Sequence, residues 1–402
     1  MSARRLRPIA AATFLVLASC ARTETYGFVA VLGNDTTSVE RVTRSGTRIV
    51  GDAIGRSPTV TRRHWEAELA PNGVIKSWSM DTYIPNAPPA DQRIHHTAVF
   101  SDLATSFTRR TSAGNHAWAY QRTYAETVPW NAFVYATWEL LLDAARRQPD
   151  TTRARIGQYF FEGWDEGHVG YADVVRQPDG SYAISSTGLA GTGIARVDAS
   201  GRLTSYSGQG TTYKQEVRRI TDVPDIDAIT TRFGAEEQRT GLARFLSPRD
   251  TVRATVGGAS LTIDYGRPAR RGRALVGALL PYDEVWRTGA NAATQLTVSA
   301  PVDLAGVSLR AGTYTLWTLP SRTGVTLIIN GQSGQWGTEY DAGQDIARRA
   351  MTVDSMPGNV EQFTIRIAPP SGHAGESRLT LEWGSFRWSA PIRAPRRDGG
   401  AP

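Results

Sequence analysis

Short runs of alternating apolar and polar residues recur along most of the chain, separated by turn sequences. Trp65, Ala67 and Leu69 alternate in this way before the turn Pro71-Asn72-Gly73. A period of two places the apolar side chains on one face of a strand, and turns of this composition reverse the chain. Residues 21–224 are therefore predicted to form a curved antiparallel β domain.

One stretch of this region has helical spacing instead. From Pro129 to Gln148 the apolar residues follow one broad stripe, and Arg146 and Arg147 stand at the end where a cation suits the helix dipole. The pattern predicts a helix over about 130–147. One helix among ten or more strands indicates a half-barrel-like sheet around or against it, which resembles the half-barrel lipoprotein carriers of the bacterial periplasm.

Residues 225–247 have the composition of a helical linker. Asp225 is a plausible N-cap before Ile226, Ile229 and Phe233, and Ser247-Pro248 ends the segment. We place the boundary between two domains here.

The second domain, residues 248–393, has the most regular alternation. Leu261, Ile263 and Tyr265 alternate, and at least five more runs of this kind follow with almost no helical spacing. This pattern is typical of a β-sandwich of the jelly-roll or immunoglobulin-like kind. Residues 394–402 are expected to be a disordered tail.

The N-terminus indicates export and lipid attachment. A leader with three arginines precedes a short apolar run, and Leu17-Ala18-Ser19-Cys20 has the form of a lipobox, so residues 1–20 are predicted to be a lipoprotein signal peptide. Cys20 is the only cysteine, which makes it the expected lipidation site, bearing diacylglycerol and palmitate. An ordinary signal peptide with an incidental cysteine is the alternative. Ala21 favours the outer membrane over retention at the inner membrane, on the periplasmic or the surface face.

Charge and histidine spacing exclude several functions. The net charge is +7, but Lys76 and Lys214 are the only lysines and the arginines are scattered, which is not the clustering of a nucleic-acid-binding protein. Adjacent His95 and His96 point to opposite faces of a strand, and no metal-binding spacing occurs, so neither a metal nor a cofactor is expected. The loop Glu162–His168 carries two carboxylates and an imidazole, and a solvated turn is favoured there over an acid/base pair or a calcium loop.

The second domain resembles the bacterial family catalogued as domain of unknown function 2911. The motifs that carry this resemblance, in order, are Tyr265-Gly266-Arg267-Pro268, Gly272-Arg273, Gly277, Pro281-Tyr282, Trp286-Arg287-Thr288-Gly289-Ala290-Asn291, Ala311-Gly312-Thr313-Tyr314, Pro320, Asn330, Trp336-Gly337 and Asp345. They span about residues 246–393. The family occurs in secreted and lipid-anchored proteins and brings no established activity. Its pattern has a glutamate where this chain has Ala292.

Candidate ligand-binding residues come from these motifs: Tyr265, Arg267, Arg273, Trp286, Arg287, Gly289, Asn291, Trp336 and Asp345. Arginine binds carboxylate or phosphate through two parallel hydrogen bonds, and it equally holds a buried internal carboxylate such as Asp345. Both roles remain open from the sequence.

Two functions are compatible with these observations. The first is a non-catalytic envelope lipoprotein, in which the curved domain shelters an apolar ligand and the sandwich binds an anionic or sugar-like small molecule. The second is a hydrolase of envelope or imported carbohydrate, lipid or ester substrates, with Arg287 and Asn291 as oxyanion donors. Ala292 in place of the acid favours binding, and the catalytic residues of a hydrolase stay unknown.

Overall fold

The computed structural model describes residues 23–56, 59–161, 167–240, 247–371 and 376–394. The proposed signal peptide, Cys20, nearly all of the C-terminal tail and most of the loop Glu162–His168 lie outside these ranges. Within them, neither helix is long and apolar enough to cross a membrane.

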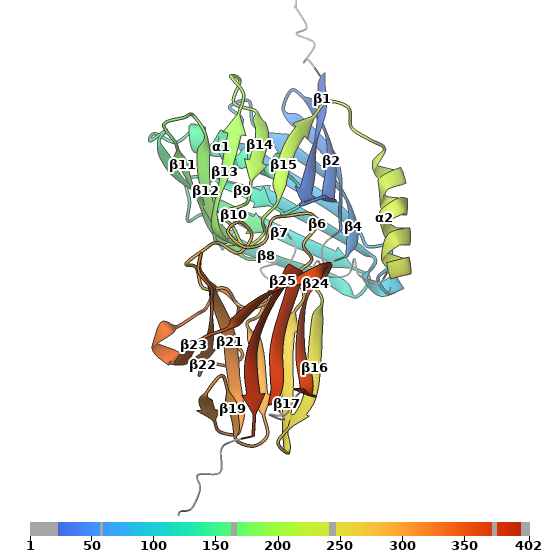
Figure 1. Cartoon of the computed structure of the whole chain (residues 1–402). Coiled ribbons are helices and arrows are strands. Elements are labelled where there is room, and N and C mark those ends of the chain that lie inside the picture. The colour runs from blue at the N-terminus through green and yellow to red at the C-terminus, as the bar shows by residue number, and fades with distance from the viewer. Residues whose placement is uncertain (1–22, 57–58, 162–166, 241–246, 372–375, 395–402) are drawn as a thin grey trace, which may run out of the picture.

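The N-terminal part is one curved sheet of fifteen strands, in the order β8-β7-β6-β5-β4-β3-β2-β1-β15-β14-β13-β12-β11-β10-β9 (Figure 1). Its pairings are antiparallel except that of β9 with β10, which is parallel. The strands are β1 (Thr23–Leu32), β2 (Asp35–Ser45), β3 (Arg48–Arg56), β4 (Val60–Leu69), β5 (Ile75–Tyr83), β6 (Arg93–Phe100), β7 (Ala104–Thr111), β8 (Gly114–Gln121), β9 (Thr127–Trp130), β10 (Arg153–Phe160), β11 (Val169–Arg176), β12 (Tyr182–Ser186), β13 (Leu189–Val197), β14 (Leu203–Ser207) and β15 (Glu216–Ile220). The predicted curved antiparallel sheet with one main helix is confirmed.

That helix, α1 (Ala136–Arg146), lies inside the curve of the sheet and begins later than predicted. Pro129 belongs to β9, and the Asn131 side chain accepts a hydrogen bond from the Phe133 N–H (2.9 Å), which keeps this segment out of the helix. The cap comes from a distant strand, because Glu40 Oε2 on β2 accepts from the N–H groups of Tyr135 (2.6 Å) and Ala136 (3.1 Å).

The space inside the curve is filled by aromatic side chains. Trp65 stacks on Trp78 with ring centroids 4.6 Å apart, and Phe107 stacks on Tyr159 at 3.4 Å. These residues belong to one buried cluster with the apolar side of α1. An apolar ligand sheltered inside the curve would have to displace this core.

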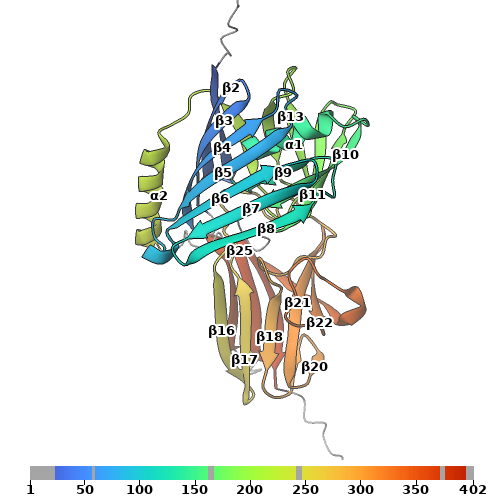
Figure 2. The same cartoon turned by 180° about the vertical axis from the view of Figure 1, so that it is seen from behind.

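A second helix, α2 (Ile226–Thr240), covers part of the outer face of the sheet (Figure 2). Asp225 Oδ1 accepts from the N–H groups of Asp227 (2.8 Å) and Ala228 (3.2 Å), which confirms the predicted N-cap. Ile226, Ile229 and Phe233 are buried against Val39, Ile54 and Val60 of the sheet. Residues 226–240 are therefore helical, and they pack on the sheet of the first domain.

The C-terminal part is a β-sandwich, as predicted. Its sheets have the orders β16-β17-β18-β21-β22-β23 and β20-β19-β25-β24, and one apolar cluster contains residues from both. The strands are β16 (Arg249–Val256), β17 (Ala259–Gly266), β18 (Thr294–Val298), β19 (Val302–Leu304), β20 (Val307–Leu309), β21 (Gly312–Pro320), β22 (Val325–Asn330), β23 (Asp345–Ala350), β24 (Thr352–Ser371) and β25 (Glu376–Arg393), with short 3-10 turns at Pro89–Asp91 and Ala342–Gln344.

Candidate functional site

Of the candidate residues from the sequence, Tyr265 is a core residue of the sandwich and Trp286 packs against that core. Tyr265 is fully buried, and its hydroxyl accepts a hydrogen bond from the Ile365 N–H (3.0 Å). The Trp286 ring stacks on Trp383 with centroids 5.9 Å apart, and its indole N–H donates to the Gly289 carbonyl (3.1 Å). Both aromatic rings therefore stabilise the corner that carries the other candidates.

The candidate arginines bind mainly to the protein itself. Arg267 donates to the Phe363 carbonyl (3.2 Å) and lies 3.2 Å from a carboxylate oxygen of Asp250. Arg273 donates to two main-chain carbonyls, Ala269 O (2.7 Å) and Arg270 O (3.0 Å).

Asp345, named from the sequence as an example of a carboxylate that an arginine could hold, is paired with residues other than Arg287. Asp345 accepts from Tyr340 (2.6 Å) and Asn330 (2.9 Å) and forms an ion pair with Arg348 (2.8 Å). Burial opposes ionisation of Asp345, but these three donors outweigh it and lower the pKa of the carboxyl. All three partners of Asp345 are close to it in the sequence. Arg287, which is far from it in the sequence, makes other contacts.

Arg287, Gly289, Asn291 and Trp336 are brought together. Ala292 forms a β-bridge with Trp336, and Arg287 donates to the Asn291 carbonyl (3.2 Å). Trp336 is half exposed (51%), although its motif partner Gly337 is pressed against Arg287. The corner thus brings four candidate residues together, while Tyr265, Arg267 and Asp345 contact other parts of the domain.

The backbone of this corner is strained. Thr288 has φ 50° and Asn291 has φ 64°, a region that a β-branched residue rarely occupies. The Thr288 carbonyl accepts from the Thr294 hydroxyl (2.7 Å), and the Asn291 amide donates to the Ser247 carbonyl (3.4 Å). Because the Asn291 amide donates to a main-chain carbonyl, the paired oxyanion-donor role expected of Arg287 and Asn291 in a hydrolase has no support in this geometry.

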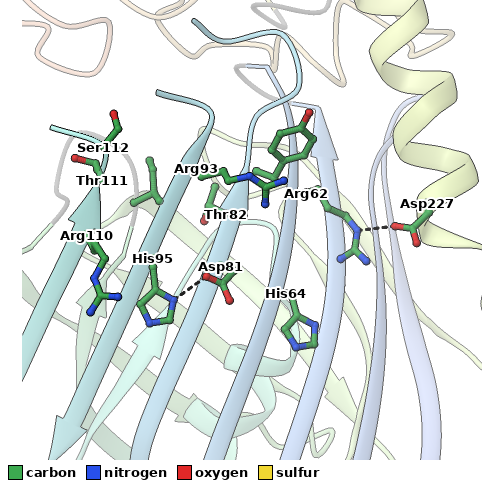
Figure 3. Close-up of a pocket in the computed structure, with 12 residues that line it drawn as sticks. Arg62, His64, Asp81, Thr82, Arg93, His95, Arg110, Thr111, Ser112 and Asp227 are labelled. Atoms are coloured by element: carbon green, nitrogen blue, oxygen red, sulfur yellow. Dashed lines mark hydrogen bonds and ion pairs between the residues drawn. The ribbon is translucent and has the colours of Figure 1, made fainter. Parts of the chain in front are cut away.

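A second candidate site, which the sequence did not indicate, is an open pocket of about 490 Å³ on the outer face of the curved sheet (Figure 3). We call it the outer pocket. It lies over β4 to β7 beside the start of α2, and its lining residues are Arg62, His64, Asp81, Thr82, Tyr83, Arg93, Ile94, His95, Arg110, Thr111, Ser112 and Asp227.

Strand register builds a row of ionisable groups across this pocket. Asp52 on β3, His64 on β4, Asp81 on β5, His95 on β6 and Arg110 on β7 are direct cross-strand partners in that order. Directly opposed side chains lie on the same face of a sheet, close enough to interact. The row therefore continues from one strand to the next across the pocket.

Carboxylates orient both imidazoles of the row. His64 Nδ1 lies 2.9 Å from Asp52 Oδ1, and His95 Nδ1 lies 2.7 Å from Asp81 Oδ1. Burial opposes ionisation of Asp52, but the hydrogen bonds from His64 and Arg62 outweigh it and lower the pKa of this carboxyl. Both histidines are thus paired with carboxylates, and His96 is buried on the other face, as the alternation predicted.

The arginines of the outer pocket differ in their partners. Arg62 forms ion pairs with Asp52 (2.7 Å) and Asp227 (3.1 Å). Arg93 lies over the Tyr83 ring, 4.9 Å from its centroid. Across the described ranges, neither Arg93 nor Arg110 has a carboxylate at ion-pair distance, so both guanidinium groups are available to an anion. Three His, Cys, Asp or Glu side chains do not meet in a metal-binding arrangement anywhere in the part of the chain described.

The C-terminal part of the chain matches one known family. Residues 247–392 match the family described as "Protein of unknown function (DUF2911)". This segment is consistent with a DUF2911 domain. The match confirms the resemblance that the sequence motifs indicated, and it covers the strained corner but not the outer pocket. None of the curated proteins matches the chain.

Solved structures with low similarity to this chain include the following two. One is a beta-barrel-like protein of the domain of unknown function DUF1849 from Brucella abortus, with 12% identity and a TM-score of 0.33, covering 51% of this chain and 98% of that one. The other is a DUF1089 family protein from Pseudomonas aeruginosa, with 13% identity and a TM-score of 0.32, covering 44% of this chain and 93% of that one. Similarity at this level carries no argument about function.

Proposed function

We propose that the protein is a lipid-anchored envelope lipoprotein that binds an anionic small molecule in the outer pocket. Cys20 completes the lipobox and is the only thiol, which supports attachment to the membrane, and Ala21 favours the outer membrane. The observation that carries the binding role is the pair of guanidinium groups, Arg93 and Arg110, that line a concave site without a carboxylate partner in the described residues.

The lining favours a polar ligand that carries a phosphate or a carboxylate. Guanidinium groups bind both through paired, charge-assisted hydrogen bonds. Thr111 and Ser112 add hydroxyl groups, and a volume of about 490 Å³ is in the usual range for small-molecule sites. A sugar phosphate fits this combination, with its phosphate at the arginines and its hydroxyls at the threonine and serine side chains.

Thermal unfolding of the purified protein against a ligand panel tests this proposal. Sugar phosphates and inorganic phosphate are expected to raise the melting temperature, because a ligand that binds only the folded state stabilises it. The corresponding neutral sugars are expected to have a much smaller effect. The Arg93→Ala/Arg110→Ala variant is expected to lose the response, while Arg196→Ala, which removes one exposed cation on β13, should keep it. An unchanged response in the double variant would rule out the outer pocket as the binding site.

A further inference from the structure

His95 and Asp81 form a hydrogen-bonded pair in the outer pocket. They are direct cross-strand partners on β6 and β5, and His95 Nδ1 lies 2.7 Å from Asp81 Oδ1. An ionised carboxylate can only accept, so the imidazole donates its Nδ1 proton to Asp81. In the neutral ring the other nitrogen, Nε2, then carries the lone pair. Asp81 thereby holds His95 in the tautomer that a nucleophile or a general base needs.

The second histidine of the outer pocket differs at this nitrogen. Asp52 holds His64 at Nδ1 (2.9 Å), and His64 Nε2 lies 3.7 Å from Glu66 Oε1. By contrast, His95 Nε2 has no hydrogen-bond or ion-pair partner in the ranges that the structure describes. The His95 side chain is 34% exposed and lines the pocket, so a bound small molecule can reach this atom. Of the two imidazoles, His95 is therefore the one with an accessible lone pair.

Two arginines lie on the same face of the sheet as His95. Arg110 is its direct partner on β7, and Figure 3 shows the two side chains next to each other. Arg93 lies two residues before His95 on β6, so the alternation of the strand places it on this face as well. Directly opposed residues have Cβ atoms about 5 Å apart, close enough for their side chains to contact one phosphate group. An anion held by Arg110 therefore lies beside the His95 ring.

The charges of the pocket are unevenly distributed. Its three arginines, Arg62, Arg93 and Arg110, balance Asp81, Asp227 and the adjacent Asp52 in number. The carboxylates that face this region all have side-chain partners, which are Arg62 for Asp52 and Asp227, Arg48 for Glu66, and His95 for Asp81. Arg93 and Arg110 have no carboxylate partner in the described residues, and they lie on β6 and β7, away from the acidic groups of β3 and α2. The favourable position for a phosphoryl group is thus the β6–β7 side, next to His95.

We propose that the outer pocket is a catalytic site that hydrolyses phosphate monoesters, with His95 as the nucleophile. This inference rests on the proposed function, because the phosphate group must first bind at Arg93 and Arg110. In the first step His95 Nε2 attacks phosphorus, a nitrogen–phosphorus bond forms, and the bond from phosphorus to the ester oxygen breaks. The ester oxygen leaves with the electron pair of that bond and takes the proton of the phosphate monoanion, which releases an alcohol.

Water completes the reaction. Its oxygen attacks phosphorus, the nitrogen–phosphorus bond breaks with its electron pair returning to Nε2, and both water protons remain on the released dihydrogen phosphate. Ester and water are thus converted into alcohol and phosphate, with His95 regenerated and no other reactant consumed. Arg93 and Arg110 stabilise the negative charge on the phosphoryl oxygens. Asp81 is a positioning residue, because it keeps the Nδ1 proton and the orientation of the ring.

Hydrolysis of p-nitrophenyl phosphate by the full-length protein, followed by absorbance with a metal chelator present, tests this activity. We expect turnover by the wild type, and a phosphoryl group on His95 in peptides mapped by mass spectrometry under alkaline conditions, which preserve phosphohistidine. His95→Asn, which keeps a donor for Asp81, should abolish both turnover and adduct but retain thermal stabilisation by inorganic phosphate. His116→Asn makes the same substitution at an exposed histidine on β8 outside the pocket, and it should behave as the wild type.

Asp81→Asn tests the positioning role. The asparagine amide donates to Nδ1 and so places the imidazole proton on Nε2. Turnover and adduct formation should fall by about a hundredfold or more, while the response to inorganic phosphate is kept.

The outcomes separate this inference from the proposed function. Stabilisation of the wild type by phosphate, without turnover or an adduct on His95, would overturn the catalytic role and leave the binding role intact. Turnover that His95→Asn retains would also overturn it. A wild-type protein that phosphate does not stabilise would contradict the binding role, and the catalytic role with it.

Discussion

The carboxyl group of Glu40 gives the sharpest prediction about stability. It is fully buried on β2, where Oε2 accepts from the first N–H groups of α1 and Oε1 accepts from the Trp65 indole (3.1 Å). Burial raises the pKa of Glu40 from 4.5 to about 8, although the three N–H donors lower it. The carboxyl is therefore both the cap of the helix and a buried acid.

The sign of the pH dependence follows from this shift. Between about pH 4.5 and pH 8 the folded protein holds a proton on Glu40 that the unfolded chain has released. The contribution of this group to the free energy of unfolding is thus fully present below pH 4.5 and is lost as the pH rises through 8. At about 1.4 kcal/mol for each pKa unit, the loss amounts to as much as about 5 kcal/mol.

Glu40→Gln tests this reasoning, because glutamine does not titrate and keeps one oxygen to accept from the helix. We expect the wild type to lose stability relative to this variant as the pH rises from 5 to 8.5, measured by urea unfolding with tryptophan fluorescence. Glu66→Gln, at a more exposed carboxylate paired with Arg48, is the matched control and should show no such trend over this range. Parallel curves for the wild type and Glu40→Gln would refute the account of the buried acid. Glu40→Ala, which leaves three buried donors without an acceptor, is expected to lose about 3 kcal/mol or more.

Three further predictions concern anchoring, the sandwich and the outer helix. Cys20→Ser is expected to abolish acylation, and a variant that still incorporated labelled palmitate would exclude the lipoprotein assignment. Asp345→Ala should cost the DUF2911 domain about 1–3 kcal/mol in thermal unfolding, since the carboxylate binds Tyr340, Asn330 and Arg348; an unchanged melting temperature would contradict this. Phe233→Ala should release α2 from the sheet and expose residues 226–240 to limited proteolysis, whereas the wild type and the exposed Thr231→Ala variant should resist; equal cleavage of all three proteins would show that the helix is not held by this contact.

Much of the fold could be predicted because it depends on local alternation. Each strand needs only its own period of two to be recognised, and the turn residues mark its ends. The start of α1 could not be predicted, because its cap is Glu40, which lies 95 residues before Tyr135 in the chain. Similarly, the docking of α2 depends on apolar residues of β2, β3 and β4 that the helix sequence does not reveal.

The candidate sites, too, could be predicted only where the local sequence defines them. The motifs located the corner of the DUF2911 domain, but the sequence could not show that Trp286 packs against the core while Arg287 is half-buried and donates to the Asn291 carbonyl. The outer pocket was missed because its row consists of single outward-facing residues on separate strands. Only the register of β3 to β7 aligns Asp52, His95 and Arg110 with one another. The acid, histidine and arginine residues of the row are visible in the sequence. Their alignment becomes apparent only when the order in which the strands pair is known.

The most direct test of the central claim is equilibrium binding of a sugar phosphate by isothermal titration calorimetry, at low and at moderate salt. The wild-type protein and Arg196→Ala are expected to bind with the same affinity, weaker at higher salt, because exposed charges are screened. Arg110→Ala is expected to bind about tenfold or more weakly, since a hydrogen bond to a charged group contributes about 1.5–3 kcal/mol. Equal affinity of the wild type and Arg110→Ala for the sugar phosphate would contradict the assignment of the outer pocket as an anion-binding site.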